Sequence, residues 1–564
     1  MKVTIKGKGK VTLTQQDFVA EGGQGKVFAR GGTAFKVYHD PANMMPEGKI
    51  LELSKLPVPL FSRPHDLLLD KRSKVIGYTT KFVQDAYVLC QLFPRSFRDR
   101  EGLTHQHTLS LAEKMRDGIG VAHKAGIILV DPNEMNFLVG RKFKTLTFID
   151  TDSYQTKSYP ATAIMASIRD PHMTGLAFNE GTDWYSFACV AFQLLTGIHP
   201  YKGKHPTIKG FQNRMKANVS VFNPAVSVPK SVYDFGVIPA DWRAWFEAVL
   251  DRGERIAPPG GTLTVAFIKP VVSAISGSDN IILEEIGMYD GTVTGVWGNG
   301  QHLVVSTNKG LWVNGQKSSG HGDVVAVGFS PAMGVPVGVR HPDDVPELFN
   351  TVTRQPVSFG LNAQRVAGTN GRVFIKNRDK VLDVVISDVG GGVVASTRKV
   401  VSVLPNASLL FPGGVAQNML GSAFINLFSG GASHQVRIPE LDEYRILGGQ
   451  YDEGVKGGVL MIIGVKGGKT DRLAFRFDDT FSSYDMRTVA DVQSGDLNFV
   501  VTDKGICILL DADHDCLELS SVRKGSTAVK TITDKAIGGD MRLFKRGAQV
   551  LVAQGNRVFT MTMK

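Results

Sequence analysis

The chain has 564 residues, more than one hydrophobic core holds, because single cores stop growing at about 250 to 300 residues. Hydrophobic residues make up 43% and charged residues 21% of the chain, and the mean hydropathy is −0.03, which excludes a disordered or collagen-like protein. The 64 basic and 53 acidic side chains leave a formal charge of +11, a mild excess at this length, so nucleic-acid binding is not expected. We expect two or three globular domains.

The densest basic run lies at the N-terminus, where lysines alternate with glycine and β-forming residues. Such a run fits either a nucleic-acid-binding arm or an exposed edge strand whose lysines resist aggregation, and the alternation favours the edge strand. The lysines are Lys2, Lys6, Lys8 and Lys10.

The cysteines and the apolar segments bear on the compartment. Cys90, Cys189, Cys507 and Cys516 form no CxxC pair, and Cys189 lies in an apolar helical run, which suits a reducing compartment. The chain begins without an apolar signal region, and no window approaches about 18 uninterrupted apolar residues. We therefore expect a cytoplasmic protein with no membrane partner.

Residues 1–272 mix strand-like and helical patterns and are predicted to form an α+β domain. Apolar residues at three- and four-residue spacing run from Leu109 to Ala122 and place one stripe on a helix. A second, buried helix is predicted from Trp184 to Leu195, ending at Thr196 and Gly197.

The composition changes after a small, polar stretch at 273–284, which is predicted to be a linker. In 285–564 many short β-branched runs are separated by glycine-centred turns, which predicts an all-β domain. Its size and turn spacing favour a β-propeller of six or seven blades, with a pair of β-sandwiches as the alternative, because no WD or kelch signature is present. The turn glycines used as marks are Gly310, Gly371, Gly505 and Gly555.

A glycine cluster and a lysine form the first candidate site. Gly22, Gly23 and Gly25 stand in EGGQGKVF between two β-like runs, where backbone amides can approach phosphate oxygens, although a glycine hairpin without a ligand is commoner. Lys36 follows at an inward position of the apolar stretch AFKVY. A buried lysine needs an anionic partner, and a phosphate or a carboxylate would supply one.

Two acids and an amide form the second candidate site. Asp131 and Asn136 stand in LVDPNEMNFLV, and Asp150 follows an apolar strand in LTFIDTDS. Oxygen ligands at the ends of short strands can hold magnesium and position an attacking hydroxyl. Each residue alone could simply cap a turn, but the ordered set favours a site.

In this order, the glycine loop, strand lysine, Asp-x4-Asn loop and metal-binding Asp resemble the protein-kinase fold. The stretches DWYSF and FQLLTGIHPY resemble the large-lobe helix of eukaryotic-like kinases, and IDTDSYQ with GGQG resembles a bacterial and phage branch of them. The resemblance implies a bilobal α+β domain in the cytoplasm of a bacterium, or of an infected host cell if phage-encoded. The DNA-binding tails often found in that branch are not seen here.

The resemblance implies roles at a nucleotide site. Lys36 would bind the α and β phosphates of ATP, with Glu47 as its helix partner, or Glu52 in its place. The phosphate loop and the hinge beside the adenine would be formed by Gly22, Gly23, Gly25, Lys81, Phe82 and Val83.

It also implies that Asp131 orients or deprotonates the acceptor hydroxyl. Asn136 and Asp150 would hold Mg²⁺.

The sequence departs from the kinase pattern at several positions. Leu129 and Val130 replace the usual His-Arg before the catalytic Asp, so activity is not expected to need a phosphorylated activation loop. Ala20 replaces the first loop glycine, Asp152 stands where the metal motif usually has glycine, and no Ala-Pro-Glu occurs near Asp170. These departures concern docking and regulation more than ATP binding.

Three functions remain open from the sequence. An active, ATP-dependent Ser/Thr protein kinase is favoured, with the all-β domain recruiting a protein substrate or partner. The alternatives are a pseudokinase scaffold and a small-molecule kinase. Scattered histidines in the second half favour no metal site there; they are His321, His341, His434 and His514.

Overall fold

The computed structural model describes residues 1–161, 164–261, 280–319, 322–454, 457–493 and 495–564. The chain divides into two compact units. Unit 1 comprises Met1–Pro94, Leu103–Val228 and Val232–Pro270, and unit 2 comprises Arg95–Gly102, Pro229–Ser231 and Val271–Lys564.

Unit 1 opens with a sheet of strand order β2-β1-β6-β7-β5-β4-β3. The lysine-rich N-terminal segment forms its first two strands, and β2 is the outer strand, as the sequence predicted. The strands are β1 (Lys2–Ile5), β2 (Gly9–Thr12), β3 (Phe18–Glu21), β4 (Gly25–Arg30), β5 (Thr33–Tyr38), β6 (Leu67–Leu69) and β7 (Val75–Lys81). Phe18, Phe35, Leu68 and Tyr78 are buried, so burial of apolar side chains stabilises this sheet.

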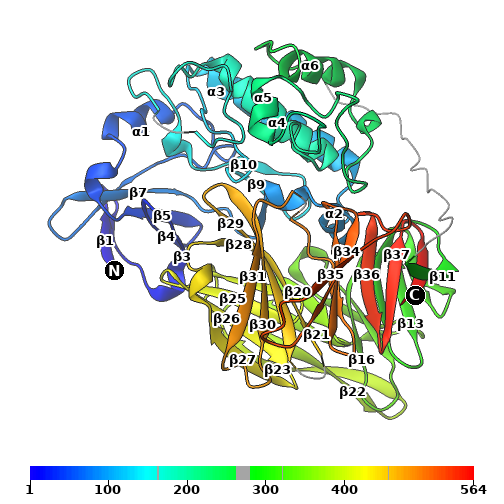
Figure 1. The fold of residues 1–564 in the computed structure, drawn as a ribbon. Coiled ribbons are helices and arrows are strands. Elements are labelled where there is room, and N and C mark those ends of the chain that lie inside the picture. The colour runs from blue at the N-terminus through cyan, green and yellow to red at the C-terminus, as the bar shows by residue number, and fades with distance from the viewer. Residues whose placement is uncertain (162–163, 262–279, 320–321, 455–456, 494) are drawn as a thin grey trace. The chain divides into compact units, whose positions relative to one another are not determined.

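Helices form the rest of unit 1, with a small sheet of order β10-β9-β8. The helices are α1 (Glu47–Leu53), α3 (His105–Lys124), α4 (Glu180–Thr196), α5 (Phe211–Lys216) and α6 (Ala240–Leu250). The small sheet consists of β8 (Ala86–Val88), β9 (Phe137–Gly140) and β10 (Leu146–Phe148). In Figure 1, α3, α4 and α6 lie together, and α4 contacts both of the others.

Both predicted helices are confirmed. On α3 the predicted stripe from Leu109 to Ala122 is buried. Helix α4 begins before Trp184 and ends at Gly197, whose φ of +83° suits a residue without a side chain. Almost every α4 residue is buried, so this helix is the central element of the helical part of unit 1.

Unit 2 consists of four-stranded antiparallel sheets, seven of them in the part of the chain that the structure describes. The first four contain β12 (Val293–Gly298), β13 (Leu303–Thr307), β14 (Gly310–Val313) and β15 (Gln316–Ser319); β16 (Val324–Phe329), β17 (Pro336–Arg340), β18 (Glu347–Asn350) and β19 (Pro356–Val357); β20 (Arg365–Thr369), β21 (Arg372–Asn377), β22 (Lys380–Val389) and β23 (Gly392–Ser402); and β24 (Ser408–Phe411), β25 (Gly414–Met419), β26 (Ser422–Ser429) and β27 (Ala432–Arg437). The other three contain β28 (Arg445–Glu453), β29 (Gly458–Lys466), β30 (Lys469–Phe477) and β31 (Tyr484–Val489); β32 (Phe499–Val501), β33 (Ile506–Asp511), β34 (Cys516–Ser521) and β35 (Val529–Thr533); and β36 (Met541–Arg546), β37 (Gln549–Gln554), β38 (Arg557–Met563) and β11 (Ile281–Met288). The predicted all-β second half is confirmed.

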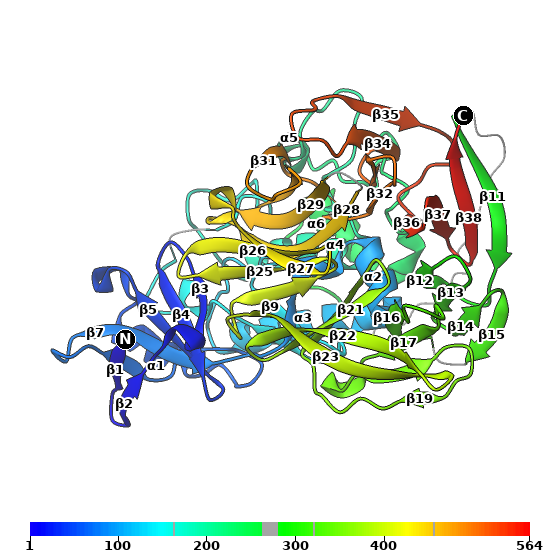
Figure 2. The ribbon, with the colours of Figure 1, turned by 90° about the horizontal axis from the view of Figure 1, so that it is seen from below.

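The sheets of unit 2 follow one another in a ring (Figure 2). The strands β12, β16, β20, β24, β28, β32 and β36 each contact the next in this order, and β36 contacts β12. In the last sheet β38 pairs with β11, which comes from the start of this unit, so one sheet is built from both ends of the β-rich segment.

Apolar side chains fill the space between neighbouring sheets. Ile425 and Leu427 from β26 lie in one buried cluster with Leu460 and Ile462 from β29 of the next sheet. Burial of each such side chain contributes about 1.5 to 3 kcal/mol, so a sheet is stabilised mainly by its neighbours.

Two short segments from the first half of the chain belong to unit 2. Helix α2 (Arg95–Glu101) contacts β12, and the hydroxyl of Ser96 donates to the buried carboxylate of Asp496. The backbone N–H of Lys230 donates to Asp515 at 3.1 Å. Unit 2 is therefore not one continuous stretch of sequence.

The segment predicted as a linker, 273–284, lies partly outside the described residues; its last four residues begin β11. The predicted hairpin turns at Gly310, Gly371, Gly505 and Gly555 each lie between two paired strands. None of the helices that the structure describes combines the length and the hydropathy that a membrane-spanning helix requires.

Candidate functional site

The glycine cluster forms the turn between β3 and β4. The N–H of Gly22 donates to the carbonyl of Gly25 at 2.9 Å, which closes the turn. A Cβ on Gly25 would lie 2.2 Å from the carbonyl oxygen of Val37, so only glycine fits there. A Cβ on Gly22 or Gly23 would meet no atom within 4 Å, so no side chain crowds this turn, although the N–H and the carbonyl of Gly22 are both engaged with Gly25.

Lys36 projects from β5 toward two carboxylates. Its Nζ lies 2.6 Å from Asp152 Oδ2 and 3.3 Å from Asp150 Oδ1, and Gln24 Oε1 of the glycine turn is also 3.3 Å away. Burial alone would lower the pKa of Lys36, but Asp152 and Asp150 outweigh burial and raise it. Lys36 therefore carries a firmly held positive charge.

The helix that follows β5 reaches the site through Lys49. Glu47 begins α1, is exposed, and contacts Lys6 Nζ at 2.8 Å. Glu52 accepts a hydrogen bond from the N–H of Ser158 at 3.3 Å. Lys49 is buried on the inner side of α1 and donates to the carbonyl of Asp152 at 2.7 Å. The structure thus brings Lys36 together with the aspartates and not with Glu47 or Glu52.

The loop before β9 holds Asp131 and Asn136 side by side. Asp131 Oδ1 accepts from the N–H of Met165 at 3.0 Å, and its Oδ2 accepts from Asn133 Nδ2 at 2.9 Å. Asn136 Nδ2 donates to the carbonyl of Asp131 at 3.0 Å. Burial raises the pKa of Asp131, although the two hydrogen bonds to its carboxylate oppose this.

Asp150 lies just after β10, beside the same loop. The N–H of Ile149 donates to the carbonyl of Asn136 at 3.0 Å, which fixes Asp150 near Asn136. Asp150 has a φ of +57°, a conformation that Asp tolerates better than most residues. Its side chain is 51% exposed. Desolvation and the nearby Asp152 carboxylate raise the pKa of Asp150, although Lys36 opposes them.

Asp183 on α4 stabilises the loop that contains Asp131. It was not assigned this role from the sequence. Its side chain, on α4, is fully buried and accepts hydrogen bonds of 2.8 Å from His123 Nε2 and from the N–H groups of Leu129 and Val130. Val130 has a φ of +71°, an unfavourable conformation for a β-branched residue. Asp183 stabilises this conformation directly before Asp131.

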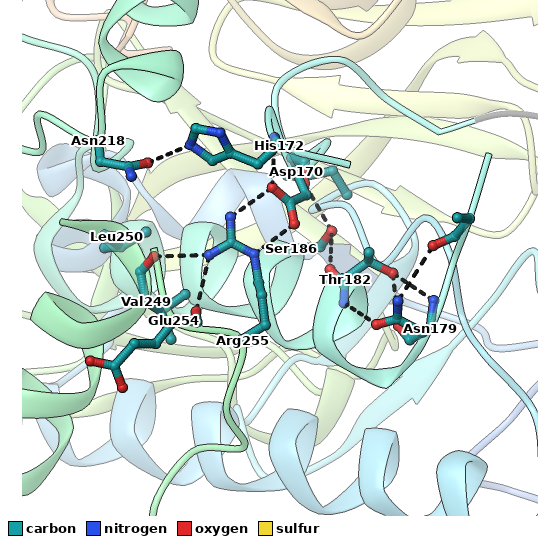
Figure 3. Close-up of polar contacts among 12 residues, drawn as sticks. Asp170, His172, Asn179, Thr182, Ser186, Asn218, Val249, Leu250, Glu254 and Arg255 are labelled. Carbon is teal, nitrogen blue, oxygen red and sulfur yellow. Dashed lines mark hydrogen bonds and ion pairs between the residues drawn. The ribbon is translucent and has the colours of Figure 1, made fainter. Parts of the chain in front are cut away.

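The segment between Asp150 and α4 is fixed at its far end by an ion pair. Figure 3 shows the guanidinium of Arg255 facing the carboxylate of Asp170. Nε and Nη2 of Arg255 each donate to this carboxylate at 2.6 Å. Hydrogen bonds from Arg255 and from the N–H of His172 lower the pKa of Asp170, although burial alone would raise it. Ser186 Oγ on α4 donates to the carbonyl of Ile168 at 2.8 Å, which anchors the same segment.

The predicted hinge residues lie at the end of β7. The N–H of Phe82 donates to the carbonyl of Gly32 at 2.9 Å, Lys81 pairs in register with Thr33, and Val83 follows them. A cavity of about 490 Å³ is lined by Lys81, Thr80, Thr33 and Ile50, among other residues, but not by Lys36 or the aspartates of the site. It is distinct from the lysine and carboxylate cluster.

Comparison with known proteins gives the site no relative. No family model matches the chain. No curated protein matches it either. The function must therefore be argued from the geometry.

Proposed function

We propose that unit 1 is an ATP- and Mg²⁺-dependent phosphotransferase of the Ser/Thr protein-kinase type. The observation that carries the proposal is the meeting of Lys36 with Asp150, whose Nζ and Oδ1 lie 3.3 Å apart although the residues are 114 positions apart in sequence. Asn136 adjoins them through its hydrogen bonds to Asp131 and Ile149. A phosphate-binding cation, oxygen ligands for a metal and a candidate base occur together.

The residues present fit a hard divalent cation. Asp150 offers a half-exposed carboxylate, and Asn136 uses its amide nitrogen on Asp131, which leaves the amide oxygen as the available ligand. Among the described residues, no three His, Cys, Asp or Glu side chains form a metal-binding group, so phosphate oxygens would have to complete the shell, as is usual for Mg²⁺. Magnesium held there would neutralise charge on the phosphates.

The remaining groups act on the substrates directly. Lys36 would place its positive charge on the phosphates, and a turn without side chains at Gly22 and Gly23 would allow them close approach. Asp131 is oriented by the hydrogen bonds from Met165 and Asn133. Its carboxylate can orient the acceptor hydroxyl and accept its proton.

A phosphoryl-transfer assay tests the proposal. The full chain, incubated with γ-labelled ATP, Mg²⁺ and a generic protein substrate, should transfer label, and Lys36→Ala, Asp131→Asn and Asp150→Asn should each reduce transfer by about 100-fold or more. Lys71→Ala, at an exposed turn between β6 and β7, is the matched control and should retain full activity. Label found only on a small-molecule acceptor would favour a small-molecule kinase.

The opposite results would remove the proposal. Wild-type turnover in Lys36→Ala or Asp150→Asn would show that the cluster is not the site. A chain that binds ATP and Mg²⁺ but transfers no phosphate to any acceptor would favour a scaffold role instead.

We further propose that unit 2 is a seven-bladed β-propeller. Three observations support it: each sheet has four antiparallel strands, the first strands of successive sheets contact one another in a closed series, and β11 completes the last sheet. Small-angle scattering and an experimental structure of the full chain would test the blade number.

This ring offers a broad, rigid face of loops, and we propose that it selects the protein substrate or partner. Substrate phosphorylation by the full chain should be competed by an antibody fragment raised against the unit 2 loops, while autophosphorylation should not. Equal loss of both activities would contradict the division of labour.

A further inference from the structure

We propose that Asp152 is the positioning residue that holds Lys36 for the phosphates, in the role expected of a helix glutamate. This inference rests on the proposed phosphotransferase function and deepens it. It concerns a residue that the sequence marked only as a departure from the usual glycine.

The contacts of Asp152 are those of a residue that fixes a lysine. Its carboxylate is 8% exposed, and Oδ2 accepts from Lys36 Nζ at 2.6 Å and from the hydroxyl of Tyr38 at 2.8 Å. The Lys36 ammonium also lies 5.4 Å from the ring centroid of Tyr38 and 5.9 Å from that of Tyr78. The lysine is thus held by one short ion pair between two aromatic rings.

The other carboxylates are less suited to this role. Glu47 is 59% exposed and is engaged with Lys6, and Asp150 lies further from Lys36 and is half exposed. Because the Asp152 pair is the shortest and the most buried, it is the least screened by solvent. Asp150 can therefore serve a metal while Asp152 keeps the lysine in place.

The backbone of Asp152 adds a second link. Lys49 of α1 donates to the Asp152 carbonyl at 2.7 Å, and Asp152 lies in the 3-10 turn Thr151–Ser153 directly after Asp150. The phosphate-binding lysine and the proposed metal ligand are thus held by one short turn. In this arrangement α1 contributes to the position of Lys36 through the contact of Lys49 with the turn, and not through a glutamate of α1.

The test is a double-mutant cycle on the full chain, read out as affinity for a fluorescent ATP analogue with Mg²⁺ and as kcat and KM for ATP. Asp152→Asn should weaken nucleotide affinity by about 10-fold or more and raise KM for ATP, because Asn cannot pair with the ammonium. In the background of Lys36→Met, Asp152→Asn should have no further effect, because it acts through the lysine. Glu47→Gln, at an exposed position, should stay within twofold of wild type.

The outcomes separate this inference from the proposed function. If wild type binds no nucleotide and transfers no phosphate, the proposed function fails and the inference with it. The inference is overturned if wild type is active but Asp152→Asn keeps the wild-type nucleotide affinity and KM. It is also overturned if Asp152→Asn lowers nucleotide affinity by the same factor in the wild-type and Lys36→Met backgrounds, because Asp152 would then have a structural role. If Asp152→Asn does not fold, the nucleotide affinity of Glu47→Gln decides. A tenfold loss of affinity in Glu47→Gln would assign the positioning role to Glu47 and overturn the inference. Unchanged affinity would leave Asp152 as the partner of Lys36.

Discussion

The two units differ in the interactions that stabilise their buried regions. In unit 1 single buried carboxylates collect donors from distant parts of the chain: Asp183 from the Leu129 loop and α3, Asp152 from Lys36, and Asp170 from Arg255. In unit 2 almost every strand pairs with its neighbour in sequence, and apolar clusters join one sheet to the next. Loss of one of these three carboxylates therefore leaves buried donors without their acceptor, whereas the apolar contacts between the sheets of unit 2 are shared among many similar side chains.

The largest effect is expected from Asp183→Ala. This substitution leaves the N–H groups of Leu129 and Val130 without their acceptor in the protein interior, which should destabilise unit 1 by about 3 to 5 kcal/mol and abolish transfer. Chemical unfolding followed by fluorescence would measure the loss, with Lys71→Ala at the exposed turn between β6 and β7 as the control. A fully stable Asp183→Ala would mean that the Asp131 loop needs no such support.

In unit 2 the expected effect of a core truncation is somewhat smaller and separable from catalysis. Ile462→Ala removes a fully buried side chain between two sheets and should cost about 3 kcal/mol in the unfolding transition of that unit. Nucleotide affinity should be unchanged, and Ile506→Ala, at a side chain that is 37% exposed, should cost much less. If Ile462→Ala also lowered nucleotide affinity, the stability of unit 2 would not be separable from the site in unit 1.

The Asp170 pair should contribute less. Asp170→Asn breaks a charged, two-contact interaction with Arg255 and should destabilise unit 1 by about 2 kcal/mol at neutral pH. Because the folded pKa of Asp170 is below its ordinary value of 3.8, this stability is fully present above that pH and is lost as the pH falls below it. Urea unfolding at pH 7 and at pH 3 would detect the difference, and the same cost at both values would contradict it. Asp117→Asn, an exposed aspartate beside Arg116, is the control.

The smallest effect has the opposite sign. Burial, with a lesser contribution from Glu453, raises the pKa of Asp452 in unit 2 to about 6, although the N–H of Val501 and Lys545 oppose it. The folded state therefore binds more protons than the unfolded state between about pH 4 and 6, and stability falls as the pH rises through this range. Asp452→Asn keeps an acceptor for the N–H of Val501 and removes the buried charge, but it adds a buried amide N–H that needs an acceptor. We therefore expect the free energy of unfolding of unit 2 to rise by about 1 kcal/mol at pH 8.

Thermal unfolding of unit 2 at pH 8 and at pH 4 would measure this gain, which should vanish at the lower pH. The exposed Asp479→Asn should show no such dependence. Identical pH profiles for wild type and Asp452→Asn would show that the buried carboxylate does not control the stability of the ring.

Much of the fold could be predicted because its signals are local. The 3.6-residue stripe on α3 and the glycine turns of unit 2 depend on neighbouring residues alone. The number of sheets could not be counted from the marks, because Gly371 and Gly505 lie between the first two strands of their sheets, while Gly310 and Gly555 lie at the next hairpin. Because these four glycines lie at different hairpins of their sheets, their spacing along the sequence does not equal the repeat length of the sheets.

The site could be predicted only in its main residues. Lys36, Asp131, Asn136 and Asp150 follow a recognisable order, but the partner of Lys36 depends on which face of α1 turns inward. That face is set by burial of Lys49, Ile50 and Leu53, which leaves Glu47 outside. Likewise, spacing along the sequence cannot show that Asp183 lies under the Leu129 loop, because this requires the packing of α4.

The pairing of β11 with β38 has a consequence for biosynthesis. Strand β11 leaves the ribosome first among the ring strands, yet its partner extends to Met563, so it must wait unpaired while the intervening sheets are made. At about 5 to 20 residues per second this wait is on the order of tens of seconds, long enough for an exposed strand edge to meet other nascent chains. Glu284 and Glu285 in the middle of β11 are exposed, and charges on a waiting edge disfavour pairing with the wrong partner.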